Sequence, residues 1–430
     1  MNHLVWFRND LRTLDNTALH EACKGDRVIG VYCFDPRHYE QGPFGFLRTG
    51  QYRAQFLIET VTALRKNLAE LHIPLFIYQA KPEDVIPALV QEHHINALYY
   101  QEEWTSEEAT VANAVKAVAG TISFYTSYDQ FLYHPEDIPY SSTGAIPRVF
   151  TGFRKKCEKY SKVRPVLEKP RPMVPVNSIP NPTVIPQLQD LGLPAVKEEA
   201  RSAFPFMGGE DQAMARIKDY FWHSKKLQFY KRTRNGLIGT DYSAKLSPWL
   251  ANGSLSARTI FREVKKFEQE VTKNQDTYWL IFELIWRDFF KYISLKHGNA
   301  IFQQGGILQK QYDWEISAEK LKQWIRGETP EPFVNANMKE IAATGWMSNR
   351  GRQNVASFWA KEWQQDWRYG AAYFESLLLD YDVHSNWGNW MYNSGVGNDP
   401  RDRKLNIARQ AEMYDAQGKF QRLWLQESLF

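Results

Sequence analysis

One segment, Trp346–Asp399, combines indoles, guanidinium groups and carboxylates at close spacing. It contains six tryptophans, Arg350 and Arg352 flank one glycine, and Asp380 and Asp382 flank one tyrosine. A buried tryptophan usually needs a partner for its N–H group, and buried arginines and aspartates must pair or bind something polar. This mixture therefore suits a large planar ligand with hydrogen-bonding edges, such as a flavin or an unstacked nucleobase.

Ordered motifs add a family resemblance to this chemical argument. The segment resembles the photolyase/cryptochrome flavoproteins, and within them cryptochrome-DASH, in the runs WMSNRGRQNVASF, DWRYGAAYFESLLLDYDVHSNWGNW and GVGNDPR. Further blocks resemble the family in family order: VWFRNDLRTLDNTAL, DYSAKLSPWLANGSLSAR, ELIWRDFF and FVNANMKEIAATGWM. So many ordered blocks are far more specific than any single short motif.

The resemblance implies an FAD site in the C-terminal part of the chain. It implies that the ribityl-diphosphate part of FAD contacts Tyr230, Ser243, Leu246 and Ser247. Serines and free N–H groups at a helix N-terminus form a natural phosphate site, because the helix dipole also faces the anion. From the residues alone, a simple helix cap is the better interpretation of this block, and the resemblance reverses that preference.

The resemblance also implies the surroundings of the isoalloxazine ring. Arg352 and Asp380 would pair beside the ring, a costly arrangement when buried unless it is well hydrogen-bonded. A surface bridge between two helices is the plain alternative. Asp382 would hydrogen-bond the flavin edge. Asn386 would face N5, where an amide can donate or accept a hydrogen bond, and asparagine here is the photolyase-like rather than the plant-cryptochrome choice.

The family's three-tryptophan electron-transfer chain is matched by Trp390, Trp367 and Trp314. The resemblance implies that Trp390 lies next to the flavin, Trp367 is intermediate and Trp314 is near solvent. An excited flavin takes an electron from a nearby oxidisable ring, and the hole moves outward through rings in close contact. By residue type alone, all three would be core or surface aromatics.

A cavity for an extruded pyrimidine dimer is implied at Glu283, Trp286, Asn349 and Arg350. Glu283 and Asn349 would hydrogen-bond base edges. Trp286 would stack on the flipped lesion, and Arg350 would hold the phosphate backbone.

Two positions depart from the photolyase pattern. Gln353 stands where photolyases usually carry methionine, and Tyr392 stands where they carry a second stacking tryptophan. Both changes make the cavity more polar and weaken stacking, whereas extruding a lesion from duplex costs a few kcal/mol. We therefore expect blue-light-driven repair of cyclobutane pyrimidine dimers, preferentially in single-stranded DNA, with RNA as a further candidate partner. The alternative is a non-enzymatic photoreceptor or nucleic-acid-binding signalling protein with the same pocket and tryptophans.

A second chromophore is implied at Glu103, which resembles the acidic residue that holds 5,10-methenyltetrahydrofolate in relatives. The following residues also read as a helix start, with Thr105 or Ser106 as cap and acids in the first turn. Both interpretations remain open.

These side chains must be positioned by two folded parts. The first, residues 1–130, alternates short β-rich runs with helical stretches, which predicts a doubly wound, Rossmann-like parallel sheet. Five strands are expected at 4–7, 28–34, 75–78, 97–100 and 122–125. A dinucleotide dehydrogenase would place a Gly-rich fingerprint after the first strand. Here that strand runs into Arg8-Asn9-Asp10-Leu11-Arg12, which disfavours that class.

Residues 131–205 are predicted to form an extended, Pro-rich connector. Eight prolines lie between Val163 and Pro194, and proline lacks an N–H donor and restricts its predecessor. A disordered tether is the alternative to a chain wrapped over the surface. Residues 206–430 carry apolar side chains at helical spacings and 13 of the 15 tryptophans, which predicts an all-helical FAD-binding domain.

Composition and the N-terminal sequence indicate which partners and which compartment to expect. The net charge of +4 and the pI near 8.7 permit a nucleic-acid partner without demanding one. The three cysteines have no metal-ligand spacing, and their odd number argues against a disulfide framework. The charged N-terminus is unlike a signal peptide, and no run suits a membrane span. We expect a cytoplasmic monomer that binds no metal.

Overall fold

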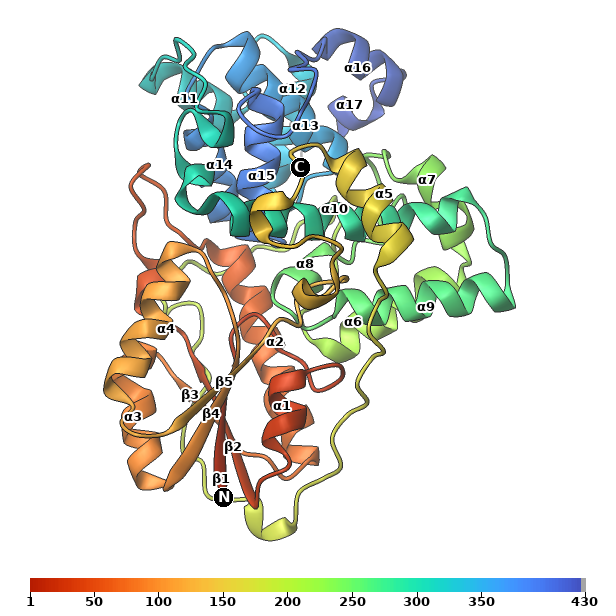
Figure 1. Ribbon diagram of the computed structural model, residues 1–430. Helices are drawn as coiled ribbons and strands as arrows, with labels where there is room; N and C mark the ends of the chain where they lie inside the picture. Colours follow the sequence, from red (N-terminus) through yellow and green to blue (C-terminus); the bar gives the residue numbers. More distant parts are fainter. Residues whose placement is uncertain (427–430) are drawn as a thin grey trace.

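The computed structural model describes residues 1–426, and its N-terminal part is a five-stranded parallel sheet in the order β3-β2-β1-β4-β5 (Figure 1). The strands are β1 (Asn2–Trp6), β2 (Arg27–Cys33), β3 (Leu75–Tyr78), β4 (Ile95–Gln101) and β5 (Ser123–Ser127). Each expected run overlaps one of these strands, and the predicted doubly wound fold is confirmed.

Helices cover both faces of the sheet: α1 (Thr17–Ala22), α2 (Gln51–Glu70), α3 (Pro82–Glu92) and α4 (Ser106–Val118). Alternate residues of β1 point to opposite faces. Val5 packs in the cluster that includes α1 and α2, whereas Leu4 and Trp6 pack in the cluster that includes α3 and α4. The central strands β1 and β2 are buried on both faces and read as nearly continuous apolar runs, whereas the edge strand β5 is largely exposed.

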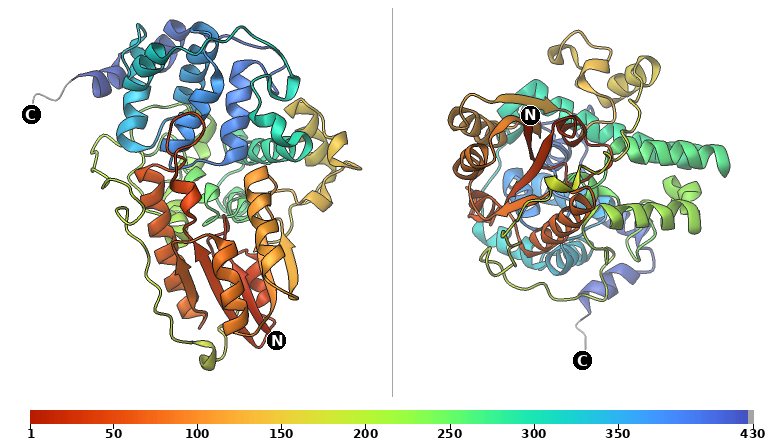
Figure 2. Two further views of the ribbon diagram at one scale, coloured as in Figure 1. Left: turned by 90° about the vertical axis from the view of Figure 1, so that its left-hand side faces the viewer. Right: turned by 90° about the horizontal axis from the view of Figure 1, so that it is seen from below.

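The connector follows the outside of the sheet layer, as the yellow-green chain in Figure 2 shows. Hydrogen bonds anchor the connector to the sheet layer. Asn177 Nδ2 donates to the carbonyl oxygens of Val28 (2.8 Å) and His72 (2.7 Å), and Met173 N donates to Leu71 O (2.9 Å). These bonds tie it to the sheet, so the tether alternative does not hold.

The structure corrects one feature of the connector predicted at 131–205, which is not extended throughout. Helix α5 (Phe150–Tyr160) lies within it. Its sequence has no proline and buries Phe150, Phe153 and Cys157 at helical spacing. After α5, the described residues up to the next helix contain only one 3₁₀ turn, Pro175–Asn177.

In the remainder of the described chain the regular secondary structure is helical apart from one isolated bridge, Glu315–Gln365, which confirms the predicted all-helical part. Its α-helices are α6 (Glu210–Ile217), α7 (Tyr230–Thr233), α8 (Ser247–Ala251), α9 (Ala257–Glu270), α10 (Gln275–His297), α11 (Ala318–Arg326), α12 (Pro332–Thr344), α13 (Asn349–Ser357), α14 (Trp367–Leu377), α15 (Val383–Ser394), α16 (Ile407–Tyr414) and α17 (Lys419–Leu425). In the part of the chain that the structure describes, none of the helices has the length and apolarity needed to span a bilayer.

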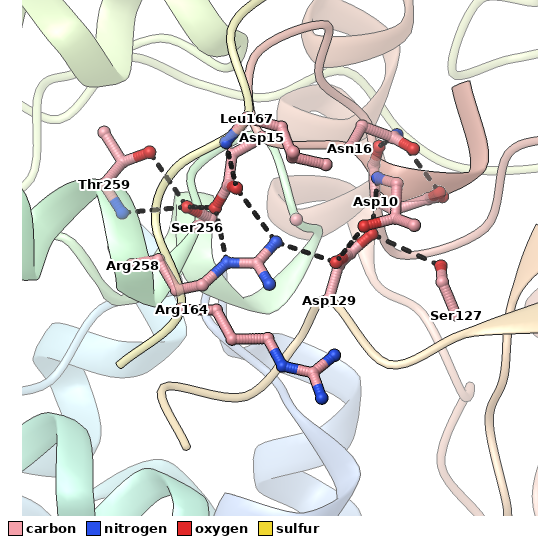
Figure 3. A network of polar contacts seen from close by, with 12 residues as sticks. Asp10, Asp15, Asn16, Ser127, Asp129, Arg164, Leu167, Ser256, Arg258 and Thr259 are labelled. Atoms are coloured by element: carbon pink, nitrogen blue, oxygen red, sulfur yellow. Dashed lines mark hydrogen bonds and ion pairs between the residues drawn. The ribbon is translucent and has the colours of Figure 1, made fainter. Parts of the chain in front are cut away.

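Buried ion pairs join the helical part to the sheet (Figure 3). Arg258 of α9 pairs with Asp15 (2.9 Å) and Asp129 (2.7 Å), and all three side chains are almost fully buried. At Gly253, φ is +73° and an added Cβ would collide with the carbonyl oxygen of Asn9. The helical part therefore covers the carboxyl end of β1, where doubly wound folds usually bind dinucleotides.

Candidate cofactor and substrate site

A cavity opens among α8, α10, α13, α14 and α15. Its empty volume, including the part open to solvent, is about 770 Å³. It collects eight of the predicted site residues: Ser247, Asn349, Arg352, Gln353, Asp380, Asp382, Asn386 and Trp390. The sequence-based assignments thus converge on one hollow from helices far apart in the chain.

An ion pair with a serine partner forms one wall of the cavity. Arg352 Nη2 lies 3.0 Å from both carboxylate oxygens of Asp380, and Ser247 Oγ donates to Asp380 Oδ2 at 2.6 Å. The side chain of Asp380 is only 4% exposed, so this is no surface bridge. Its Oδ1 atom is buried and, apart from the ionic contact with Arg352 Nη2, accepts no hydrogen bond from the described residues. A buried acceptor left open in this way fits a ligand that donates a hydrogen bond.

Asp382 contributes a second carboxylate and also starts α15. Its Oδ1 accepts from Ser385 N (2.8 Å) as the helix cap, and its Oδ2 pairs with Lys291 Nζ (2.7 Å). Burial by itself raises the pKa of Asp382, but Lys291, followed by His384 and Arg287, outweighs burial and holds the pKa well below its usual range. The group is therefore a fixed anion at the cavity.

Three asparagines of α15 line the cavity: Asn386, Asn389 and Asn393. Their spacing places them on one face of the helix. Asn386 is 8% exposed, and its Nδ2 donates to Ala371 O of α14 at 2.9 Å. The sequence argument used only Asn386, although the spacing of the three already signalled a polar helical face.

Trp390 lines the cavity at 2% exposure and packs directly on α14. An added Cβ at Gly370 would collide with its ring. Trp367 is fully buried and donates its Nε1 hydrogen to Gln304 O (2.9 Å). Trp314 is partly exposed and donates to Ala360 O (2.9 Å). Trp390 and Trp367 are thus both buried, and Trp314 is the member of this set that reaches solvent.

Trp286 and Tyr392 come together beside the cavity, with ring centroids 5.9 Å apart and planes at 87°. One face of Trp286 is stacked on Phe150 of α5, with centroids 3.7 Å apart and planes at 13°. Glu283, one turn earlier on α10, pairs with Arg234 (2.7 Å). Phe150 was missed because α5 was missed.

Arg350 is engaged by protein side chains. Its guanidinium donates to Gln353 Oε1 (2.9 Å), Asn235 Oδ1 (3.2 Å) and Gln410 Oε1 (3.4 Å), and it lies 4.4 Å from the ring centroid of Tyr414. A DNA phosphate would have to replace these neutral amide oxygens.

Three of the residues assigned to the diphosphate lie outside the lining of this cavity: Tyr230, Ser243 and Leu246. Leu246 is the N-cap of α8, and Ser243 O accepts from Arg216 Nη2 (3.2 Å). Conversely, Arg287 lines the cavity without having been predicted. Its place directly after Trp286 in the ELIWRDFF block was the available signal.

Glu103 lies just beyond β4 in a polar cluster. Its Oε1 accepts from Asn9 Nδ2 (2.9 Å) and Gln101 Nε2 (3.3 Å), and its Oε2 lies 3.8 Å from Arg8 Nη2. Burial, followed by the charge of Glu103, raises the pKa of Glu108 to about 7. Arg8 Nη1 and Gln101 Oε1 are buried without a partner among the described residues, so the cluster has polar atoms left for a ligand.

Comparisons with known proteins identify related domains and related full-length chains. The DNA photolyase domain matches residues 3–175, and the FAD binding domain of DNA photolyase matches residues 279–428. The cryptochrome DASH of Gloeobacter violaceus is 47% identical over 99% of this chain and 85% of its own length, and that of Danio rerio is 45% identical over 98% and 82%.

Two solved structures share the fold. A Synechocystis cryptochrome superposes with a TM-score of 0.95 at 44% identity, covering 99% of this chain and 88% of that one. A class III photolyase from Agrobacterium tumefaciens gives 0.81 at 25% identity, covering 99% and 86%. The sheet, the helical part and the matched domains define a photolyase-type protein with an FAD-binding domain. The chain belongs to the photolyase/cryptochrome family, in its cryptochrome-DASH subgroup.

Proposed function

We propose that the cavity holds FAD and that the protein uses blue light to split cyclobutane pyrimidine dimers, preferentially in single-stranded DNA. One observation carries the proposal. The buried Asp380 carboxylate, held by Arg352 and Ser247, shares its cavity with Trp390, an oxidisable ring. When bound, reduced FAD would absorb the light and supply the electron that opens the dimer. The electron would return to the flavin after the bonds break.

Each residue of the cavity has a role that its contacts support. Asp380 offers an open acceptor to a donor on the flavin edge, while Arg352 and Ser247 fix its orientation. Asp382, ionised beside Lys291, adds a second acceptor. Asn386, anchored to Ala371 O, presents an amide to the ring. The side chain of Asp380 is only 4% exposed, and this burial strengthens its polar contacts.

The lesion would stack on Trp286. Because Phe150 backs one face of this indole, only the opposite face is left for a base. Tyr392 meets Trp286 edge-on rather than extending the stacking surface. Stacking contributes about 1–3 kcal/mol per base, and extrusion from duplex costs a few kcal/mol. A single-stranded lesion avoids much of that cost, which supports the substrate preference.

The decisive assay is repair of a dimer-containing oligonucleotide under blue light, single-stranded beside duplex, with the flavin fully reduced. We expect efficient repair of the single strand and poor repair of the duplex. Equal repair of both substrates would refute the preference.

A matched pair of variants tests the substrate side of the site. Glu283 accepts from Trp279 Nε1, and Glu263 accepts from Trp222 Nε1, both at 3.1 Å. Glu283→Ala should lower repair yield more than DNA affinity, because its role is at the dimer itself. Glu263→Ala should leave repair unchanged. Equal effects of the two substitutions would show that Glu283 has no specific role at the substrate.

One observation favours the alternative of a light sensor without enzymatic activity. Glu283 and Arg350 are each already paired within the protein, as expected if no substrate enters. If fully reduced protein repairs neither substrate, yet its flavin responds to light, the sensor is the better account.

The Glu103 cluster is the proposed place for a folate antenna. Arg8 Nη1 and Gln101 Oε1 are buried polar atoms that a pterin could satisfy. The site borders the helical part, because Trp104 stacks on His384 of α15 with centroids 4.7 Å apart.

A further inference from the structure

A series of tryptophan rings leads from Trp390 away from the predicted chain. The ring centroids of Trp390 and Trp324 lie 6.1 Å apart, those of Trp324 and Trp359 5.1 Å, and those of Trp359 and Trp363 6.4 Å. Trp324 belongs to α11, and the other two follow α13. Trp324 and Trp359 are buried, whereas Trp363 is partly exposed. The series thus runs from the cavity wall to solvent.

The chain expected from the family pattern is less continuous. Among the described residues, the ring centroids of Trp390 and Trp367 do not come within 6.4 Å of each other, and neither do those of Trp367 and Trp314. The backbone of α14 at Gly370 lies against the Trp390 ring instead. Direct ring contact therefore favours Trp324 as the next site for a hole on Trp390.

We propose that Trp324, Trp359 and Trp363 form a second electron-transfer branch from Trp390 to the surface. The branch rests on the proposed function, since it needs an oxidised flavin in the cavity. Trp390 gives one electron to the photoexcited flavin, and Trp324, Trp359 and Trp363 each pass one electron inward in turn. The flavin is reduced by one electron, and the resulting hole on Trp363 is filled by an external thiol, which is oxidised by one electron.

Proton chemistry supports this direction. An oxidised indole is a much stronger acid than a neutral one, so a nearby base would trap the hole by removing the N–H proton. Trp324 Nε1 is buried and has no partner among the described residues. Trp359 Nε1 donates to Asp366 O at 2.9 Å, and a backbone carbonyl is a very weak base. The hole stays mobile until Trp363, where water can take the proton.

Aromatic packing alone would also place indoles together in a core. Photoreduction separates the two explanations. Oxidised holoprotein is illuminated with blue light in the presence of dithiothreitol, and the rate of flavin reduction is compared among Trp367→Phe, Trp324→Phe, Trp359→Phe and the double variant Trp324→Phe/Trp367→Phe. Trp390→Phe supplies the rate without any relay.

The branch predicts that Trp367→Phe keeps a measurable part of the wild-type rate and that the double variant loses it, falling to the rate of Trp390→Phe. Trp222→Phe, a partly exposed indole bonded to Glu263, should reduce flavin as the wild type does. If Trp367→Phe is already as slow as Trp390→Phe, or if the double variant equals Trp367→Phe, the branch is refuted. If instead Trp390→Phe is as fast as the wild type, the proposed flavin function itself fails.

A second readout needs no flavin. Trp324 and Trp359 have planes 36° apart at 5.1 Å, so their near-ultraviolet transitions should couple in the circular dichroism of the apoprotein. Trp324→Phe and Trp359→Phe should each remove the same band, and Trp222→Phe should preserve it. Persistence of the band in Trp324→Phe would show that the Trp324–Trp359 ring contact, on which the branch depends, is absent. Thermal melting of each variant checks that the fold is kept.

Discussion

Two clusters of buried polar groups in this molecule differ in one respect, the space beside them. In the helical part, the Arg352–Asp380 pair faces a cavity. At the carboxyl end of β1, Arg258 is enclosed between Asp15 and Asp129, and the backbones at Gly253 and Asn9 touch. The first cluster has an acceptor left for a ligand, whereas the second uses its charges to join the two parts of the chain.

The difference shows how the dinucleotide position beyond the first strand of a Rossmann-like sheet can be closed. Open parallel sheets bind ligands in the crevice beyond the carboxyl ends of their strands. Here the helical part packs on the carboxyl end of β1 (Figure 1), which leaves no space for a dinucleotide against Asn9. The loop after β1 also lacks the glycines of a dinucleotide site. The cavity proposed for FAD lies instead among the helices that pack on the sheet.

The largest effect is expected at the cavity. Arg352→Ala should leave Asp380 without its cationic partner and sharply reduce the ratio of flavin to protein absorbance after purification. Arg352→Lys keeps the charge but loses the planar guanidinium, so its occupancy should be intermediate. Wild-type occupancy in Arg352→Ala would contradict the assignment.

The enclosed cluster should respond in stability rather than in cofactor content. Arg258→Ala leaves two buried carboxylates unpaired, and breaking a buried pair costs about 3–5 kcal/mol. The control on the same helix is Arg262→Ala, whose exposed pair with Glu168 should contribute about 0–1 kcal/mol. Chemical denaturation measures both. Similar losses would mean that the two pairs are not distinguished by burial.

A third prediction concerns pH. Glu340 of α12 is 1% exposed, and burial raises its pKa from 4.5 to about 8, with Lys245 and Arg352 opposing the rise. A raised carboxyl pKa stabilises the fold at pH values below 4.5, and this contribution is lost as the pH rises toward 8. One pKa unit corresponds to about 1.4 kcal/mol.

Glu340→Gln removes this dependence. Relative to wild type, its melting temperature should therefore increase between pH 5 and pH 8, while the exposed control Glu328→Gln should show no such trend. A flat difference for Glu340→Gln would show that the carboxyl is not neutral in the folded protein.

The smallest effect is expected at the Glu103 cluster, because the loss of an antenna leaves the flavin in place. Glu103→Gln should lower the affinity for added methenyltetrahydrofolate with FAD occupancy unchanged. The neighbouring Glu107→Gln, on an exposed carboxylate that pairs with Arg48, should bind folate as the wild type does. Equal binding by all three proteins would place any antenna elsewhere.

The sequence predicted those elements whose structure depends on a single hydrophobic periodicity or a single motif. Short β-rich runs between helical stretches predicted the strands, and apolar spacing predicted α10, because burial of one helical face leaves a periodic trace. Helix α5 was missed because the prolines after it dominated the interpretation, although Phe150, Phe153 and Cys157 carry helical spacing.

The site was predictable only through its motifs. Arg352 and Asp380 lie in separate blocks, and no spacing rule brings them together. Trp324 could not have been predicted as a neighbour of Trp390, because it lies in α11 outside the recognised blocks and the contact depends on how α11 packs against α15. Local patterns specify elements, while contacts between distant helices require the packed structure.

We expect light to move an electron from Trp390 to a flavin held in this cavity. The most direct measurement is the visible absorption of purified protein under blue light with dithiothreitol, for wild type and Trp390→Phe at equal flavin occupancy. We predict that the oxidised-flavin band bleaches readily in the wild type and slowly in Trp390→Phe, because phenylalanine keeps bulk but is hard to oxidise. Equal bleaching of the two proteins would exclude Trp390 as the electron donor, and the absence of a flavin band from both would exclude FAD binding in the cavity.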